Sequence, residues 1–407
     1  MKKNIFNALG PGLLFAGAAI GVSHLVQSTR AGAEYGYGLI WALILVHIFK
    51  YPFFKFGPKY ASATGESLLD GYHKLGKGYL ALYFVVNLAT MFTIQAAVTI
   101  VTASLATQLF GLTDNLVYWA TIILFISFLI LSFGKYQLLD KLMKYIILFL
   151  TASTLLAVII ALIKSDTSFS YQQVIPNDAV GISFLIAFLG WMPAPLDISI
   201  WHSLWSVEKQ KTTAEKVGVK KSIFDFNVGY FGTMFLGLCF ILLGATVMFS
   251  SQEKFANSGG QFALQLINLY TNNLGDFAKP IIAIAAFTTM FSTTITTLDA
   301  SPRAMEKTSK LLFNKEKLNY WFWIVFLIFG TLLILFLLLN SMLTLVKIAT
   351  IFSFLTAPIY AILNYKLITS TYTPKTQHPN TFIKVLSIAG IVFLFCFSLW
   401  YLSVLQF

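Results

Sequence analysis

Long runs of apolar residues alternate with short polar connectors along almost the whole chain. A helix needs about 20 mostly apolar residues to cross a bilayer, and eleven segments reach that length. They are predicted at approximately 9–28, 37–56, 79–109, 115–133, 142–163, 178–205, 223–249, 278–299, 319–339, 342–364 and 383–405. The longest polar stretches, near 57–78 and 250–277, are predicted to be loops. The pattern therefore predicts an all-α membrane protein with about 11 transmembrane helices.

The composition agrees with a protein whose solvent is the bilayer. The 407 residues are 57% hydrophobic and 11% charged, whereas a soluble domain carries about 25% charged residues. Cys239 and Cys396 both fall inside apolar runs, so neither a disulfide framework nor a Cys-based metal site is expected. The chain contains no nucleophile elbow, phosphate loop or His-Glu-x-x-His motif. We therefore expect neither an enzyme nor a bound cofactor.

The basic residues gather in every second connector, which predicts an orientation in the membrane. Although the net charge is +12, this clustering is typical of the positive-inside rule and argues against a nucleic-acid partner. The first inward connector is assigned Lys50, Lys55, Lys59, Lys74 and Lys77. With an odd number of spans, the N-terminus is predicted to be cytoplasmic and the C-terminus outside. The short loops favour an integral protein of the bacterial cytoplasmic (inner) membrane.

Two of the predicted spans are interrupted in mid-segment. The interruptions lie at 17–24 and at 190–197, and two prolines in the second remove backbone N–H donors. Interrupted helices at corresponding positions of two halves mark transporter binding sites. The first and sixth spans are five apart, which predicts a single transporter domain over 1–407. Its inverted repeats would cover 9–163 and 178–364, with an extra helix at 383–405. Ordinary glycine and proline kinks are the alternative.

Ionisable side chains lie at both interruptions, His24 at the first and Asp197 at the second. Such residues are costly at membrane depth and are functional candidates. If the two breaks face each other, the imidazole and the carboxylate converge and could bind a metal or exchange a proton. A structural His–Asp hydrogen bond is the alternative. The predicted substrate or ion site comprises His24, Asp197, Ser23, Gly21, Ile20, Gly190 and Ser199.

Other polar residues are candidates for a transport path or gate. They are His202, Thr293, Thr296, Arg30 and Glu34. The hydroxyls of the eighth segment could line a hydrated path or bond to their own helix. Arg30 and Glu34 are four residues apart and are predicted to pair, either as an extracellular gate or as a plain surface pair. Asp299 and Arg303 have the same spacing and are predicted to pair at the cytoplasmic end.

Two sequence runs near the start of the chain carry a family resemblance. They are Gly10-Pro11-Gly12 and Ala31-Gly32-Ala33-Glu34-Tyr35-Gly36-Tyr37-Gly38-Leu39-Ile40-Trp41. They resemble the first two helices of the NRAMP (natural resistance-associated macrophage protein) family of divalent metal transporters. The run 292–296 and the pairs Met192-Pro193 and His202-Ser203 are also similar to family motifs. The resemblance implies a LeuT-type fold with broken helices 1 and 6.

The chain departs from the family at the positions that would hold the metal. The family's Asp-Pro-Gly-Asn at the first break aligns with Gly21, Val22, Ser23 and His24, so the acidic ligand is replaced. The third span has no acidic residue between Thr90 and Leu105, where the family carries acids for proton transfer. The resemblance therefore implies a kept scaffold with a rebuilt site.

These observations lead to three functional hypotheses. The first is an NRAMP-like secondary transporter, a symporter, that moves a cation, expected to be a divalent metal, between helices 1 and 6. One carboxylate with one imidazole suits Mn, Fe or Zn better than Mg. The second is a transporter of a small organic solute such as an amino acid, held at a broken-helix N-terminus. The third is a non-transporting membrane sensor.

Overall fold

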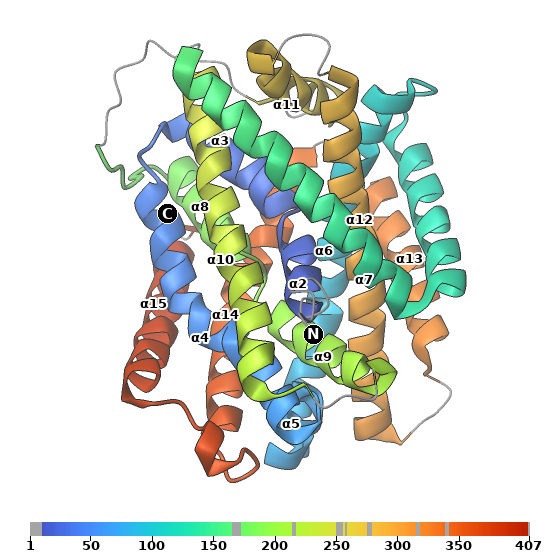
Figure 1. Cartoon of the computed structure of the whole chain (residues 1–407), viewed down its shortest axis with the longest axis vertical. Helices are drawn as coiled ribbons and strands as arrows, with labels where there is room; N and C mark the ends of the chain where they lie inside the picture. Colours follow the sequence, from blue (N-terminus) through green and yellow to red (C-terminus); the bar gives the residue numbers. More distant parts are fainter. Residues whose placement is uncertain are drawn as a thin grey trace, which may run out of the picture.

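A computed structural model describes residues 10–164, 172–213, 217–249, 255–256, 259–274, 279–314, 318–337 and 342–405, and every regular element in these ranges is helical. The α helices, labelled in Figure 1, are α2 (Pro11–Ala19), α3 (Thr29–Tyr35), α4 (Ile40–Thr64), α5 (Leu68–Leu75), α6 (Lys77–Phe110), α7 (Leu116–Lys164), α8 (Ala179–Trp191), α9 (Ile198–Thr213), α10 (Val219–Gly244), α11 (Gly259–Leu274), α12 (Lys279–Phe313), α13 (Tyr320–Leu337), α14 (Met342–Ile368) and α15 (Thr381–Leu405). Three further helical turns, not labelled there, are η1 (Ser23–Ser28), η2 (Ala245–Phe249) and η4 (Lys375–Gln377).

Within these ranges nine helical stretches are long and apolar enough to cross a membrane. A tenth span forms if α2 is joined to the helix at Ser23–Tyr35, and the two halves are bent by 46°. The sixth predicted span is two shorter helices, α8 and α9, separated by an unwound segment. The fourth and fifth predicted spans correspond to Leu116–Phe133 and Tyr145–Ile163, both within α7. The all-α membrane fold is therefore confirmed, together with interruptions in the first and sixth segments.

Two predicted loops contain helices. The stretch 57–78 holds the end of α4 and all of α5, and α11 lies within 250–277. The start of α5 has a capping box, because the Ser67 hydroxyl accepts from the Asp70 amide and the Asp70 carboxylate accepts from the Ser67 amide. Polar composition alone does not distinguish such a short capped helix from a loop.

The helices divide into a buried centre and a lipid-facing periphery. The spans in α6 and α12 are 67% and 72% buried, whereas α13 and α15 are 28% buried. Large apolar side chains such as Phe329 and Val385 are exposed on these outer helices, as expected for surfaces that contact lipid. The helices next to the two breaks, α2 and α8, are buried along almost their whole length and so lie inside a shell of more exposed helices.

The first span is fixed by close packing against α10. A methyl group at Gly12 would lie 2.1 Å from the backbone oxygen of Asp225, so only glycine allows this approach. The Asp225 carboxylate accepts hydrogen bonds from the amides of Gly10 (3.0 Å) and Gly12 (2.9 Å). These contacts satisfy backbone donors at the start of α2 and so anchor the first half of the first span to α10.

Candidate functional site

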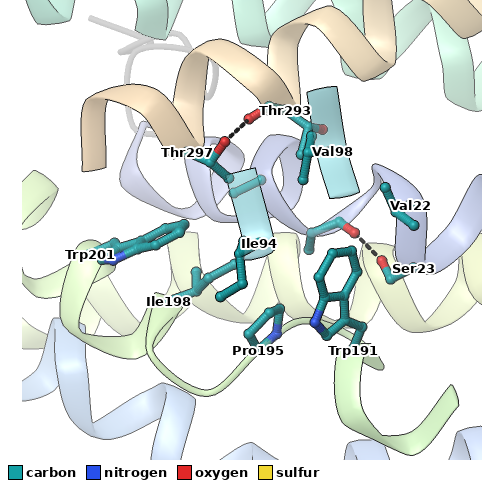
Figure 2. A pocket seen from close by; sticks show the side chains of 12 residues that line it. Val22, Ser23, Ile94, Val98, Trp191, Pro195, Ile198, Trp201, Thr293 and Thr297 are labelled. Atoms are coloured by element: carbon teal, nitrogen blue, oxygen red, sulfur yellow. Dashed lines mark hydrogen bonds between the residues drawn. The ribbon is translucent and has the colours of Figure 1, made fainter. Parts of the chain in front are cut away.

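The two helix breaks face each other across a small cavity. The break after α2 supplies one wall and the break between α8 and α9 the opposite one, while α6 and α12 close the sides (Figure 2). The space open to the centre of a water molecule is about 20 Å³, room for about one water or one small ion. Its lining is largely apolar, and the side-chain oxygens on it belong to Ser23, Thr293 and Thr297.

Gly21 allows α12 to approach the first break. A methyl group at Gly21 would lie 2.7 Å from the Thr293 hydroxyl oxygen and 2.8 Å from its methyl carbon. The Thr293 hydroxyl donates to the backbone oxygen of Gly17 at 3.0 Å. Carbonyls in the last turn of a helix have no helical partner, so Thr293 satisfies one of them. The predicted site residue Gly21 therefore acts through its lack of a side chain.

Both ring nitrogens of His24 have partners at or beside its own break. Nε2 lies 2.9 Å from the backbone oxygen of Thr233 on α10. Nδ1 lies 2.8 Å from the Ser23 hydroxyl and 3.0 Å from the backbone oxygen of Ala19. The imidazole forms no hydrogen bond or ion pair with Asp197, although both residues are described. The structure thus directs His24 toward α10 and not toward the second break.

Ser23 connects the two breaks. Its hydroxyl lies 3.3 Å from the backbone oxygen of Pro193 in the unwound segment, and it is also close to the backbone oxygen of Ala19. Ser23 lines the cavity. It is the predicted site residue that the structure places most directly between the first and sixth spans.

A lysine occupies the second break. Lys50 extends from the middle of α4, is fully buried, and places its ammonium against the backbone oxygens of Leu189 (2.8 Å), Gly190 (2.7 Å), Met192 (3.0 Å) and Ala194 (3.4 Å). The structure does not support the placement of Lys50 in an inward connector. Its position inside the predicted span 37–56 was the available signal, because an intramembrane lysine is a functional candidate.

Asp197 lies at the other side of the same break. Its backbone oxygen accepts from the amides of Ile200 (2.8 Å) and Trp201 (3.3 Å), so the residue begins α9. Asp197 is 2% exposed, and neither carboxylate oxygen has a hydrogen-bond partner of good geometry among the described residues. It interacts electrostatically with Lys50, although the two do not reach the 4.0 Å of an ion pair. Asp197 is not among the residues that line the cavity.

A buried polar network joins α6 to α12 beside the cavity. The Thr297 hydroxyl donates to the Gln95 side-chain oxygen at 2.7 Å, and the Gln95 amide donates to Thr99 at 3.2 Å and to the Thr294 backbone oxygen at 3.3 Å. The hydroxyls of Thr102 and Thr294 are 2.8 Å apart. This contact was not predicted from the sequence, because nothing in the spacing of either helix shows that the two are neighbours.

Three predicted site residues have mainly structural contacts. The Ser199 hydroxyl donates to the Leu196 backbone oxygen and accepts from Asn364 on α14. Ile20 is buried in an apolar cluster. Gly190 lies against α14, because a methyl group there would be 2.3 Å from the Thr350 backbone oxygen, and its own oxygen accepts from Lys50.

The predicted path and gate residues lie at separate places. His202 is buried among aromatic rings, with Phe15 at 5.9 Å and Phe226 at 5.8 Å between ring centroids. The Thr296 hydroxyl donates to the Ser292 backbone oxygen of its own helix. The Arg30–Glu34 pair is confirmed at 2.8 Å, and the Arg30 guanidinium also lies 4.8 Å from the Phe184 ring centroid on α8.

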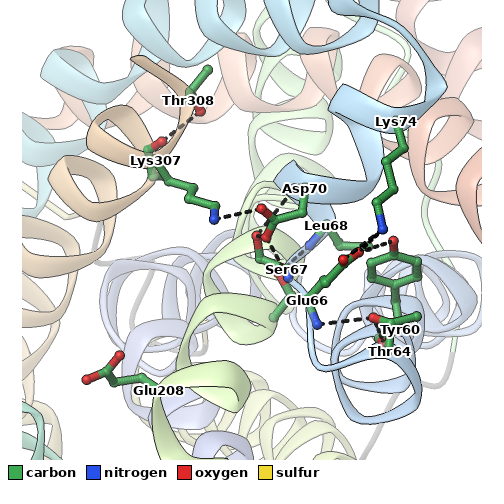
Figure 3. Close-up of polar contacts among 12 residues, drawn as sticks. Tyr60, Thr64, Glu66, Ser67, Leu68, Asp70, Lys74, Glu208, Lys307 and Thr308 are labelled. Atoms are coloured by element: carbon green, nitrogen blue, oxygen red, sulfur yellow. Dashed lines mark hydrogen bonds and ion pairs between the residues drawn. The ribbon is translucent and has the colours of Figure 1, made fainter. Parts of the chain in front are cut away.

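Ion pairs join the helices at the end of the molecule where α4, α9 and α12 finish, here called the lysine-rich end. Lys307 of α12 pairs with Asp70 of α5 at 2.6 Å (Figure 3). The predicted Asp299–Arg303 pair is confirmed at 2.8 Å, and Tyr320 donates to Asp299 at 2.6 Å. A cavity lies between α5, α9 and α12 at this end, and the centres of water molecules could occupy about 140 Å³ of it.

Asp70 has a lowered pKa. Burial raises the pKa of its carboxyl, but the hydrogen bond from Lys307, the hydrogen bond from Ser67 and the Lys307 charge outweigh burial and bring it below its ordinary value. The Asp70–Lys307 pair is therefore charged at neutral pH and connects α5 to α12.

No ready-made metal centre is present in the part of the chain that the structure describes. Across these ranges, no three His, Cys, Asp or Glu side chains lie close enough together to hold an ion. The Met192 sulfur lies 3.6 Å from the Ser28 hydroxyl, away from the cavity lining. Oxygen atoms of hydroxyls and carbonyls are therefore the groups that the cavity offers, and these suit hard cations.

Comparison with known proteins identifies the family. The model of the natural resistance-associated macrophage protein-like family matches residues 12–404. The chain belongs to this family. An uncharacterized protein of Pasteurella multocida (strain Pm70) is 37% identical to it over 406 residues, 98% of this chain and 92% of the relative.

Solved structures agree with the natural resistance-associated macrophage protein-like assignment. A variant of the manganese transporter of Eremococcus coleocola superposes with a TM-score of 0.74 at 13% identity, over 96% of this chain and 85% of the other. MhsT in complex with L-phenylalanine gives a TM-score of 0.62 at 13% identity, over 96% and 98%. At such identities the likeness shows the fold, which is the LeuT type. The protein is thus an integral membrane protein of a transporter family.

Proposed function

We propose that this protein is a secondary transporter that moves a small cation, in the first instance a divalent metal ion, through the cavity between the two helix breaks. The observation that carries the proposal is the convergence of Ser23 and Thr293, from the first break and from α12, on a cavity sized for one ion. Family membership and a fold shared with a manganese transporter support it.

The donor set favours a hard divalent cation. Hydroxyl and carbonyl oxygens suit Mg²⁺ or Mn²⁺, whereas thioether and imidazole ligands select softer metals. Met192 and His24 both have partners elsewhere. An ion in this cavity would keep part of its water shell, because few protein oxygens face it. In this proposal, the lysine-rich end faces the cytoplasm.

A second candidate is a small organic solute. The apolar lining, which includes Trp191 and Trp201, favours it, because organic-ligand sites combine apolar walls with a few polar groups. The cavity as it stands is too small for such a solute, so α6 or α12 would have to move.

Uptake into liposomes separates the two candidates. The purified protein would be reconstituted, and uptake of Mn²⁺ and Mg²⁺ followed with an internal dye, with internal pH recorded in parallel. Ser23→Ala should reduce uptake of the ion by about tenfold, since the loss of one oxygen that contacts the ion costs about 1–2 kcal/mol. Thr288→Val is the matched control, because that hydroxyl bonds only to its own helix among the described residues.

The outcomes are distinct. Uptake of a divalent ion by the wild type and loss in Ser23→Ala support the ion. Uptake of radiolabelled amino acids without divalent uptake favours the organic solute. Folded protein that moves neither kind of substrate contradicts both and favours the sensor.

A further inference from the structure

The Lys50 ammonium lies where a free cation could otherwise bind. Three backbone oxygens lie 2.7–3.0 Å from its nitrogen and a fourth at 3.4 Å. An ammonium has three N–H donors, and three close oxygens satisfy them. Rings of backbone carbonyls are also how membrane proteins replace the water shell of a monovalent ion.

The backbone at the break makes these oxygens available. Leu189 and Gly190 belong to the last turn of α8, where carbonyls have no helical partner. Pro193 and Pro195 supply no N–H to the unwound segment. The C-terminal end of a helix also attracts positive charge. A hydrogen-bond donor or a cation is therefore needed here, since the oxygens are buried away from water, and the helix end favours a positively charged one.

We propose that Lys50 is a tethered cation that fills a monovalent-cation site at the break of the sixth span. The carbonyl oxygens between α8 and α9 are then occupied by Lys50 and do not serve as ligands of the transported ion. The first half of the proposal stands on the contacts of Lys50 alone. The second half rests on the proposed function, because it assumes that an ion passes through the adjoining cavity.

The contacts of Lys50 limit which oxygens a transported ion can bind. Trp191 and Pro195 line the cavity and flank the carbonyls that Lys50 holds. A transported ion is thus left with the oxygens of the first break and of α12. Since the break already holds a positive charge, the protein needs no separate Na⁺ or K⁺ bound there to keep the two half-helices together.

Removing the Lys50 side chain should turn the group of backbone oxygens around its ammonium into a site for free ammonium ions. In Lys50→Ala the carbonyl oxygens and the space for the side chain remain, so ammonium, methylammonium or propylammonium chloride should raise the thermal midpoint of the detergent-solubilised protein. We expect a rise of roughly 2 °C or more over choline chloride at equal ionic strength. The wild type should show no such shift.

Two matched variants control the experiment. Lys50→Met fills the same space with an uncharged chain and should not respond to amines. Lys55→Ala removes a lysine from the same helix that lies over the Tyr51 ring, and it should behave like the wild type. If Lys50→Ala shows no greater amine shift than Lys50→Met, the proposal is wrong. These midpoints need no transported substrate, so they are independent of the proposed function.

A second measurement uses only the wild type. Its thermal midpoint should be unchanged when Na⁺, K⁺ or choline is the sole monovalent cation. Stabilisation by Na⁺ or K⁺ over choline would overturn the proposal, because the carbonyl oxygens around Lys50 would then be open to free cations while Lys50 is present.

Discussion

Lys50 and Asp197 lie on opposite sides of one helix break: the ammonium binds the carbonyl end of α8, and the carboxylate begins α9. Each charge thus lies at the helix end whose dipole favours it. They interact electrostatically without direct contact. Because both are buried, the loss of either one leaves an uncompensated charge in the membrane.

The first prediction is a coupling between these two residues. Lys50→Met should destabilise the protein by about 3 kcal/mol, since it leaves several buried carbonyl oxygens without a donor. Asp197→Asn should cost less, about 1 kcal/mol, since the carboxylate feels the Lys50 charge without contacting it. The double variant should lose less than the sum by at least ~1 kcal/mol. Thermal or denaturant unfolding of all four proteins in one detergent measures the coupling. Additive losses would show that the two charges are independent.

The second prediction concerns the contact between Gly21 and Thr293. Gly21→Ala should destabilise the protein by about 1–3 kcal/mol through overpacking and should reduce uptake, because the methyl group displaces the Thr293 side chain. Adding Thr293→Ala should restore part of the stability. Gly232→Ala is the control, since nothing lies within 4 Å of a methyl group there. Equal effects of the two glycine variants would contradict the contact.

The third prediction tests whether His24 supports the fold or binds the metal ion. His24→Ala should cost about 1–3 kcal/mol of stability, since the Thr233 oxygen loses its partner and a buried space opens. His24→Gln can still donate toward Thr233 and should lose less. Divalent-ion affinity of both folded variants, measured by calorimetry, should stay within about threefold of the wild type. A loss of affinity with stability intact would instead support the predicted metal ligand.

The sequence predicted the helices and the two breaks because both have local signatures. Apolar runs of bilayer length show where the spans are, and Pro193 with Pro195 shows where the sixth is interrupted. The Arg30–Glu34 and Asp299–Arg303 pairs were also predictable, since residues four apart share a helix face. These predictions needed no knowledge of which helices are neighbours.

The candidate site depends on neighbours and was therefore predicted only in part. The predicted residues Ser23 and Thr293 line the cavity, but His24 turns toward α10 and Lys50 reaches the break from α4. No spacing rule connects Lys50 to residues about 140 positions away. The backbone oxygens that it binds are also invisible in a sequence, because every residue has one.

The fourth prediction is a pH dependence at the lysine-rich end. Because the folded pKa of Asp70 lies below its unfolded value, the Lys307 pair contributes stability that is present above the unfolded pKa. That stability is lost as the pH falls through the folded pKa. The contribution is about 1 kcal/mol or less, since both side chains are partly exposed.

Asp70→Asn should remove this acid-dependent part of the thermal midpoint. Midpoints recorded between neutral pH and about pH 3 would show the wild type and the variant converging at the acid end. The exposed Glu66–Lys74 pair provides the control, and Glu66→Gln should change the profile little. Parallel profiles for the wild type and Asp70→Asn would rule out the pair as the cause.

The last prediction tests whether the cavity hydroxyls bind the transported ion. Thr297 lines the cavity and also donates to Gln95, so Thr297→Val removes an oxygen and leaves a buried amide oxygen without that donor. We expect a stability loss of about 1–3 kcal/mol and a several-fold rise in the KM for divalent uptake, with Thr288→Val unchanged. If the hydroxyl only supports packing, the midpoint falls but uptake per folded molecule keeps its KM. A raised KM would instead place Thr297 among the groups that the ion touches.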